Sequence, residues 1–127
     1  MHLCSIDQAV DQALSRLPAH IHMGLPLGLG KPNAFVNALY RRIAADPSRR
    51  LTIVTALSLE KPVGKSELER HFLEPLVERV FGDYPDLDYV KALRGAGLPP
   101  NIEVHEFFLK TGDYLQNPVA QQGYIST

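Results

Sequence analysis

The sequence is poor in cysteine and lacks any long apolar run. Cys4 is its only cysteine, which excludes an intrachain disulfide and a zinc site built from several cysteines. No apolar stretch approaches the roughly 20 residues that a membrane-spanning helix needs, so we expect no membrane partner. No secretory signal is recognisable at the start of the chain, and we therefore expect a cytoplasmic location.

The sequence also lacks an excess of charge of either sign. It has 13 Lys and Arg residues against 14 Asp and Glu residues, which gives a net charge of -1. This balance excludes the broad basic surface typical of nucleic-acid-binding proteins, although it leaves room for one local anion site. A modest basic cluster, which we interpret as solvated helix and turn positions, consists of Arg41, Arg42, Arg49 and Arg50.

The length and the hydrophobic pattern predict one layered domain. A chain of 127 residues, 45% of them hydrophobic, suffices for one core and not for two, so we expect a single domain over residues 1–127. Periodicity predicts strands at residues 19–24, 51–57 and 102–109, and helices at residues 6–16, between Pro32 and Pro47, from Ser66 onward, and after a capping Asp86. Pro75 either kinks the third helix or divides it. This order predicts an α/β fold with three layers, a small and mostly parallel sheet, and helices on both faces.

The segment between the first strand and the next helix is the strongest candidate site. It reads Gly24-Leu-Pro-Leu-Gly-Leu-Gly-Lys-Pro-Asn33, with three glycines and two prolines in ten residues. Ligands of open α/β sheets bind beyond the carboxyl ends of the strands, and the free N–H groups of a helix start favour anions. We therefore predict a cradle for a phosphate, carboxylate or thioester oxygen, with these candidate binding residues: Gly24, Pro26, Gly28, Gly30, Lys31 and Asn33. The alternative, a connection that needs glycine for tight geometry, stays open.

Other motifs are weaker. Asn33 stands where a dinucleotide-binding loop would have its third glycine, and Leu59 replaces the first glycine of a P-loop that would end at Gly64-Lys65-Ser66. His20 and His22 share one strand face, but no third metal ligand is close, so we expect no metal site. Candidate polar residues near strand ends are Ser58, Glu60, His105 and Glu106, and we favour a solvent-facing Glu106 on an edge strand over a pocket acid.

Three stretches resemble the N-terminal part of the acetyl-CoA hydrolase/transferase (CoA-transferase) family. The first is the loop of residues 24–33 with the following Ala34-Phe35-Val36-Asn37-Ala38-Leu39. The others are Phe72-Leu-Glu-Pro-Leu-Val-Glu-Arg-Val-Phe-Gly-Asp-Tyr84 and Tyr114-Leu-Gln-Asn-Pro-Val-Ala-Gln-Gln-Gly-Tyr-Ile-Ser-Thr127. The similarity covers nearly the whole chain, although none of these stretches is a catalytic signature.

The resemblance implies a function that the residue spacing does not show. Family members have two related α/β domains and move coenzyme A between a thioester and a carboxylate, or hydrolyse the thioester. A glutamate of the second domain attacks the acyl-CoA, and a glycine-rich loop stabilises the transition states. No residue here matches that glutamate motif, so the catalytic residue is expected outside this chain. The resemblance thus implies coenzyme A thioester and carboxylate as substrates, with no bound cofactor.

Two classes of function therefore stay open. The first is the N-terminal domain of a CoA-transferase or acyl-CoA hydrolase, and the second is a non-catalytic domain that binds an anion or serves assembly. A small parallel sheet leaves open edges, so we expect the chain to self-associate or to dock on the remainder of a longer enzyme. If Lys31 is a partly exposed contact of the ligand, Lys31→Ala should weaken binding about tenfold or less.

Overall fold

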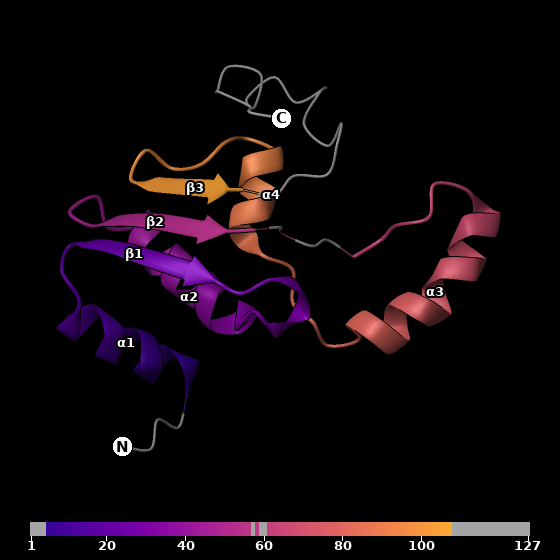
Figure 1. The fold of residues 1–127 in the computed structure, drawn as a ribbon, viewed down its shortest axis with the longest axis horizontal. Helices are drawn as coiled ribbons and strands as arrows, with labels where there is room; N and C mark the ends of the chain where they lie inside the picture. Colours follow the sequence, from indigo (N-terminus) through magenta and orange to yellow (C-terminus); the bar gives the residue numbers. More distant parts are fainter. Residues whose placement is uncertain (1–4, 57, 59–60, 108–127) are drawn as a thin grey trace.

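The computed structural model describes residues 5–56, 58 and 61–107 of the chain (Figure 1). The elements follow in the order α1 (Ile6–Arg16), β1 (His20–Leu25), the short 3-10 helix η1 (Gly28–Gly30), α2 (Asn33–Ala44), β2 (Arg50–Thr55), α3 (Glu67–Phe81), α4 (Asp88–Arg94) and β3 (Ile102–Glu106). Among these residues, no helix is both long and apolar enough to span a bilayer.

The three strands form one parallel sheet in the order β1-β2-β3. Ile21 of β1 pairs with Leu51 of β2, which pairs in turn with Ile102 of β3. Because all three strands run the same way, their carboxyl ends lie along one edge of the sheet, beside the loop that leads to α2 (Figure 1). The parallel sheet with its helices confirms the predicted α/β class.

The two faces of the sheet differ in the described part of the chain. One face meets α2, and its core side chains are Ile21, Leu51, Ile53 and Ile102 from the strands with Val36, Leu39 and Ile43 from α2. Each such side chain stabilises the fold by about 1.5–3 kcal/mol when fully buried. The other face carries His22, Val54, Glu103 and His105, all exposed. An apolar run such as that of β2 is typical of a strand buried on both faces, but Val54 is 43% exposed.

Local signals place most helix ends correctly. α1 spans the predicted residues, and the Ser5 hydroxyl accepts a hydrogen bond from the Gln8 backbone N–H. α3 continues through Pro75 as one helix, which settles the alternative of two helices. The predicted Asp86 cap is wrong, because α4 begins at Asp88 and its first backbone N–H donates to the side chain of Asn37 on α2 instead.

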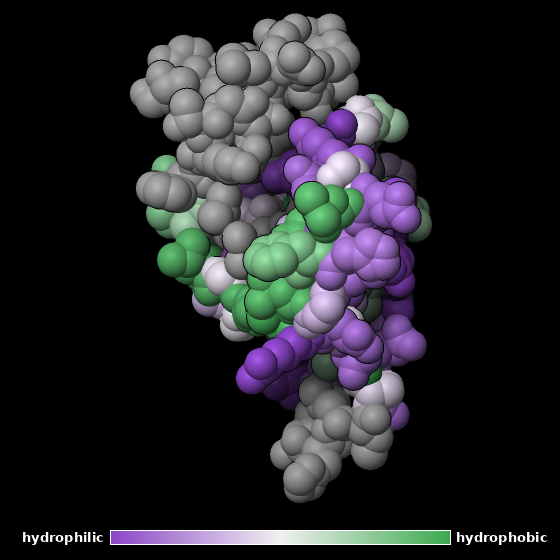
Figure 2. All heavy atoms as spheres, turned by 90° about the vertical axis from the view of Figure 1, so that its right-hand side faces the viewer, coloured by the Kyte–Doolittle hydropathy of each residue, from purple (hydrophilic) through white to green (hydrophobic). Residues whose placement is uncertain are grey.

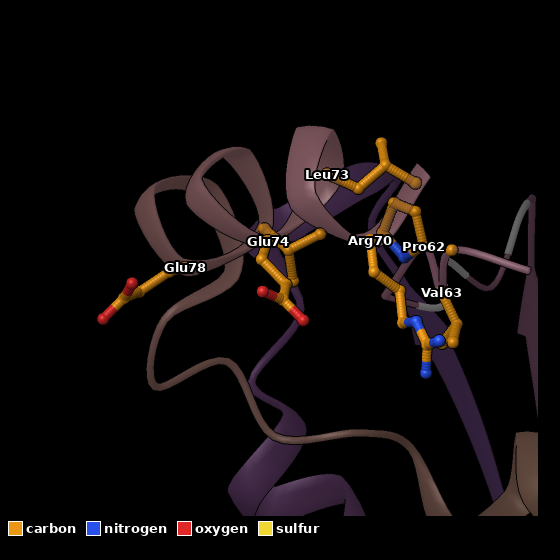
Figure 3. Close-up of a pocket in the computed structure, with 8 residues that line it drawn as sticks. Pro62, Val63, Arg70, Leu73, Glu74 and Glu78 are labelled. Carbon is orange, nitrogen blue, oxygen red and sulfur yellow. The ribbon is translucent and has the colours of Figure 1, made fainter. Parts of the chain in front are cut away.

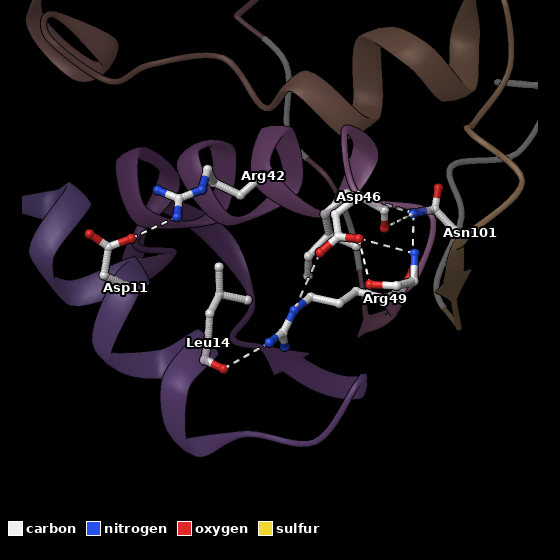
Figure 4. Close-up of polar contacts among 8 residues, drawn as sticks. Asp11, Leu14, Arg42, Asp46, Arg49 and Asn101 are labelled. Atoms are coloured by element: carbon white, nitrogen blue, oxygen red, sulfur yellow. Dashed lines mark hydrogen bonds and ion pairs between the residues drawn. The ribbon is translucent and has the colours of Figure 1, made fainter.

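The arginine cluster contributes to packing between elements. Arg42 binds Asp11 of α1 at 2.7 Å, and the guanidinium of Arg49 donates to the Leu14 carbonyl at 3.1 Å (Figure 4). The Asn101 amide donates to the carbonyl of Arg49, to that of Ile43 in the last turn of α2, and to that of Asp46 just after α2 (Figure 4). These contacts join α1, α2 and the start of β3, so the cluster serves the fold.

Candidate functional site

The predicted loop lies at the carboxyl edge of the sheet. Gly24 belongs to β1, and Pro26, the first residue after β1, is exposed. Gly28 and Gly30 are the first and last residues of η1, and Asn33 is the first residue of α2. Pro32 occupies the cap position of α2, where no side chain caps the helix. The strand–loop–helix order expected from the sequence is therefore present.

The glycines of this loop do not fill tight spaces. A methyl group added at Gly24, Gly28 or Gly30 would meet no other atom within 4 Å. Gly28 has a φ of 71°, a backbone conformation that residues other than glycine rarely adopt. The backbone geometry therefore explains why glycine occupies position 28. Close packing explains neither Gly24 nor Gly30, and both leave the backbone open to an approaching molecule.

Lys31 is the charged residue of the loop, and it is 5% exposed. Burial lowers the pKa of its ammonium group, and the nearby Glu106 carboxylate partly offsets this by raising the pKa. An ammonium group in such a place is costly to keep charged unless an anion faces it. The loop thus presents a desolvated cation at the edge where ligands of parallel sheets bind.

Glu106 ends β3 on the helix-covered face of the sheet. The solvent-facing interpretation of Glu106 is wrong, although β3 is an edge strand of the described sheet. Side chains alternate along a strand, and Ile102 is buried, so Val104 and Glu106 point to the same side as Ile102. His105 is exposed on the opposite face, as the adjacency of the two residues predicted.

Buried hydroxyl groups lie at the same edge. Thr55 ends β2, is 0% exposed, and has no hydrogen-bond partner for its Oγ1 among the described residues. Ser58, three residues further, is 3% exposed, and its Oγ lies 2.7 Å from the Tyr89 Oη. Together with the two charged groups they form what we call the carboxyl-edge cluster: Lys31, Thr55, Ser58, Tyr89 and Glu106. Within this cluster the Ser58 and Tyr89 hydroxyls bind each other, whereas the Thr55 hydroxyl has no described partner and lies next to Glu106 in the sheet.

Two asparagines of α2 hold the segment that precedes α4. The Asn33 side chain donates to the Pro85 carbonyl at 2.6 Å, and that of Asn37 donates to the Asp86 carbonyl at 2.7 Å. The Asn33 Oδ1 atom is buried and has no hydrogen-bond partner in the described residues. Because α4 carries Tyr89, these bonds also fix where the Tyr89 hydroxyl meets Ser58.

The remaining sequence motifs serve the structure. The rings of His20 and His22 lie 4.1 Å apart, and His20 Nε2 lies 2.9 Å from the Thr52 hydroxyl. In the part of the chain that the structure describes, no group of three or more His, Cys, Asp and Glu side chains could hold a metal ion. The backbone N–H groups of Lys65 and Ser66 donate to the Glu69 carboxylate, so the apparent P-loop end is a helix cap.

A separate hollow of about 420 Å³ lies between α3 and the segment before it (Figure 3). Pro62 and Val63 form one side, and Arg70 and Leu73 form the other. A methyl group at Gly64 would lie 2.5 Å from the Arg70 backbone nitrogen, so this turn requires glycine. The hollow shares no residue with the carboxyl-edge cluster, and we do not assign the site to it.

Two members of the cluster, Thr55 and Tyr89, were not predicted as site residues. Thr55 lies in the predicted second strand and Tyr89 in the predicted helix after Asp86. A buried tyrosine hydroxyl usually needs a partner, so Tyr89 could have indicated one. Glu60, Cys4 and the stretch 114–127 lie outside the described residues. Comparison of the chain with protein-family models, with curated proteins and with solved structures finds no match.

Proposed function

We propose that this chain is the N-terminal domain of an acetyl-CoA hydrolase or CoA-transferase, in which loop 24–33 binds the carboxylate or the thioester oxygen. The catalytic glutamate then comes from outside this chain, and coenzyme A is a substrate. The resemblance of the three quoted stretches to this family suggests the reaction class. We therefore assign binding and charge stabilisation to this chain, and not the nucleophile.

The burial of Lys31 is the observation that carries the proposal. A lysine at 5% exposure pays a desolvation penalty that a methionine or leucine there would avoid. An ammonium held at a fixed place stabilises the negative charge that develops on a thioester oxygen or on a carboxylate under attack. Glu106 helps to keep Lys31 charged, because its carboxylate opposes the effect of burial on the lysine pKa.

The surroundings of Lys31 support the same interpretation. Gly24, Gly28 and Gly30 leave the loop backbone accessible, so a ligand oxygen can approach the peptide N–H groups. The Thr55 hydroxyl, buried without a described partner, adds a donor beside Glu106, with which Thr55 is paired in the sheet. Donors of this kind fit a carboxylate or thioester oxygen better than an apolar ligand.

Ligand titration of the wild-type chain and of Lys31→Met tests the proposal. We expect acetyl-CoA and acetate to raise the melting temperature of the wild type, as a ligand that binds only the folded state must. Because Lys31 is buried, the tenfold limit set from the sequence is too low, and Lys31→Met should weaken binding about 10–100-fold in calorimetric titration. The matched control is Lys65→Met, which removes an exposed lysine from the turn before α3 and should leave the affinity unchanged.

The second candidate is a non-catalytic domain that binds an anion or serves assembly. Helix α3, which has no buried residue, favours a role in assembly. The same titration separates the two. A response to inorganic phosphate or to a sugar phosphate, with none to acetyl-CoA or acetate, would favour the second candidate. Equal affinities of Lys31→Met and wild type for every ligand would remove Lys31 from the site and overturn the first.

A further inference from the structure

Helix α3 exposes its apolar side to solvent. Leu68 is 81% exposed, Phe72 78%, Leu76 50% and Val80 46%, and no residue of the helix is buried. We call these four residues the α3 stripe. Figure 1 shows α3 away from the sheet, and Figure 2, which faces that side of the molecule, shows a green apolar area bordered by purple hydrophilic side chains. Apolar patches of this kind mark interaction surfaces.

The helix is well specified by its own sequence. Ser66 and Glu69 form a complete capping box, in which the Ser66 hydroxyl accepts from the Glu69 N–H and the Glu69 carboxylate accepts from the Ser66 N–H. A helix of 15 residues is nevertheless only marginally stable alone in water, and most helices depend on packing of their apolar side. The α3 stripe therefore needs an occupant.

The order of residues along α3 is self-complementary about Glu74. Leu68 and Val80 lie six residues before and after it, and Phe72 and Leu76 lie two residues before and after it. Glu69 and Arg79 lie five residues on either side and carry opposite charges. In an antiparallel pair of helices with a twofold axis at Glu74, apolar residues meet apolar residues, and each Glu69 meets an Arg79.

We propose that the occupant of the α3 stripe is a second copy of this chain, bound through α3 in an antiparallel, twofold-symmetric pair. The stripe residues are four positions apart and so form one ridge along the helix surface. Two helices that interlock such ridges cross at an interaxial angle of about -50°. A twofold interface uses the same patch on both copies, as this self-complementary order requires. The inference concerns a helix far from the carboxyl-edge cluster, so it does not depend on the proposed function.

The size of the surface sets the expected affinity. Four exposed apolar side chains per helix, with their polar borders, bury on the order of 1,000 Å² in total, which is the lower end for a specific interface. We expect a dissociation constant on the order of 1–10 μM, because small interfaces belong mostly to weak complexes. The dimer should therefore form and dissociate within the range of ordinary sedimentation experiments.

Sedimentation velocity from about 1 to 200 μM tests the association. The wild type should shift from monomer to dimer, and Phe72→Glu should stay monomeric over the whole range. Arg79→Glu should weaken the dimer at least tenfold, because each glutamate then faces the Glu69 of the other copy. The control variants Leu17→Glu and Arg16→Glu change exposed residues at and just after the end of α1 and should dimerise as the wild type does.

Crosslinking tests the direction of the pair. In a Cys4→Ser background, the double variant Leu68→Cys with Val80→Cys should be joined between copies by a short bis-maleimide, and each single variant should not. Circular dichroism of every variant shows whether α3 remains helical, which separates a lost interface from a lost helix.

A wild type that remains monomeric at 200 μM means that another occupant covers the α3 stripe, and it overturns the proposal. Crosslinking of Leu68→Cys alone indicates a parallel pair and overturns it as well.

Discussion

Replacing Asn37 with alanine tests how α2 positions α4. The Asn37 side chain is 6% exposed and makes two hydrogen bonds to backbone atoms that lie about 50 residues away in the sequence. Its amide donates to the Asp86 carbonyl at 2.7 Å, and its Oδ1 accepts from the Asp88 N–H at 2.9 Å. The second bond replaces the helix cap that Leu87, at the N-cap position of α4, does not provide.

The structure sets the magnitude of the expected loss. Each hydrogen bond contributes about 1 kcal/mol net, and an orphaned buried donor adds to the cost, so Asn37→Ala should lower the free energy of unfolding by about 2–3 kcal/mol. For a domain of this length that change lowers the melting temperature by roughly 6–10 °C. Because Tyr89 follows on the same helix turn, its contact with Ser58 should loosen in the folded state too.

Urea unfolding followed by circular dichroism measures the effect. Gln12→Ala is the matched control, because it removes an amide side chain from α1 that makes no described hydrogen bond to another element. We expect the control to lie within about 0.5 kcal/mol of the wild type, as surface substitutions usually do. A loss below about 0.5 kcal/mol for Asn37→Ala would mean that the two bonds do not hold α4, and would refute this account.

Three further outcomes are expected. Thr55→Val should raise the free energy of unfolding by about 1 kcal/mol in urea titration, because it removes a buried hydroxyl without a described partner; lower stability would contradict this. Asn101→Ala should lower that free energy by about 2 kcal/mol in the same assay, through lost bonds to three backbone carbonyls. Hydrogen bonds from Ser48 hold the pKa of Asp46 below its ordinary value of 3.8. The Asp46 carboxylate therefore stabilises the fold fully above about pH 3.8, and this contribution is lost as the pH falls through the lowered pKa. Ser48→Ala removes the hydroxyl bond and keeps the bond from the backbone N–H, so it should raise the Asp46 pKa in an NMR titration and move the acid-unfolding midpoint to higher pH. An unchanged Asp46 pKa would exclude the Ser48 hydroxyl as the main cause of the lowered pKa.

Features that depend on neighbours in the sequence were predictable. The hydrophobic period predicted α1 over the residues that it spans, and it predicted that α3 starts after Ser66. Strand ends shifted slightly, since β1 includes Leu25 and β2 starts at Arg50. β3 starts at the predicted Ile102 and ends at Glu106, and residues 108–109 of the predicted strand lie outside the described residues. Such shifts are expected, because strand ends depend on pairing with other strands.

Features that depend on distant pairs were not predictable. The Ser58 and Tyr89 hydroxyls are 31 residues apart in the sequence, and no local pattern brings them together. The Asp86 cap failed for the same reason, since a side chain of α2 supplied the bond that local capping rules assigned to the preceding residue. The side of the sheet on which Glu106 lies depends on how β3 pairs with β2, and one sequence does not reveal that register.

The buried Thr55 hydroxyl allows a test of whether the carboxyl-edge cluster binds a ligand or only supports the fold. Thr55 is 0% exposed, and an apolar side chain of similar size would cost about 1–3 kcal/mol less to bury there than a hydroxyl without a described partner. Thr55 and Lys31 both neighbour Glu106 at the carboxyl edge of the sheet, where parallel sheets bind ligands. If the proposed function holds, a bound carboxylate or thioester oxygen supplies the partner that the Thr55 hydroxyl lacks. The double variant Lys31→Met with Thr55→Val should then gain no stability from acetyl-CoA, whereas the wild type should gain stability. An equal gain by the double variant and the wild type would mean that these two polar groups belong to the fold and not to a binding site.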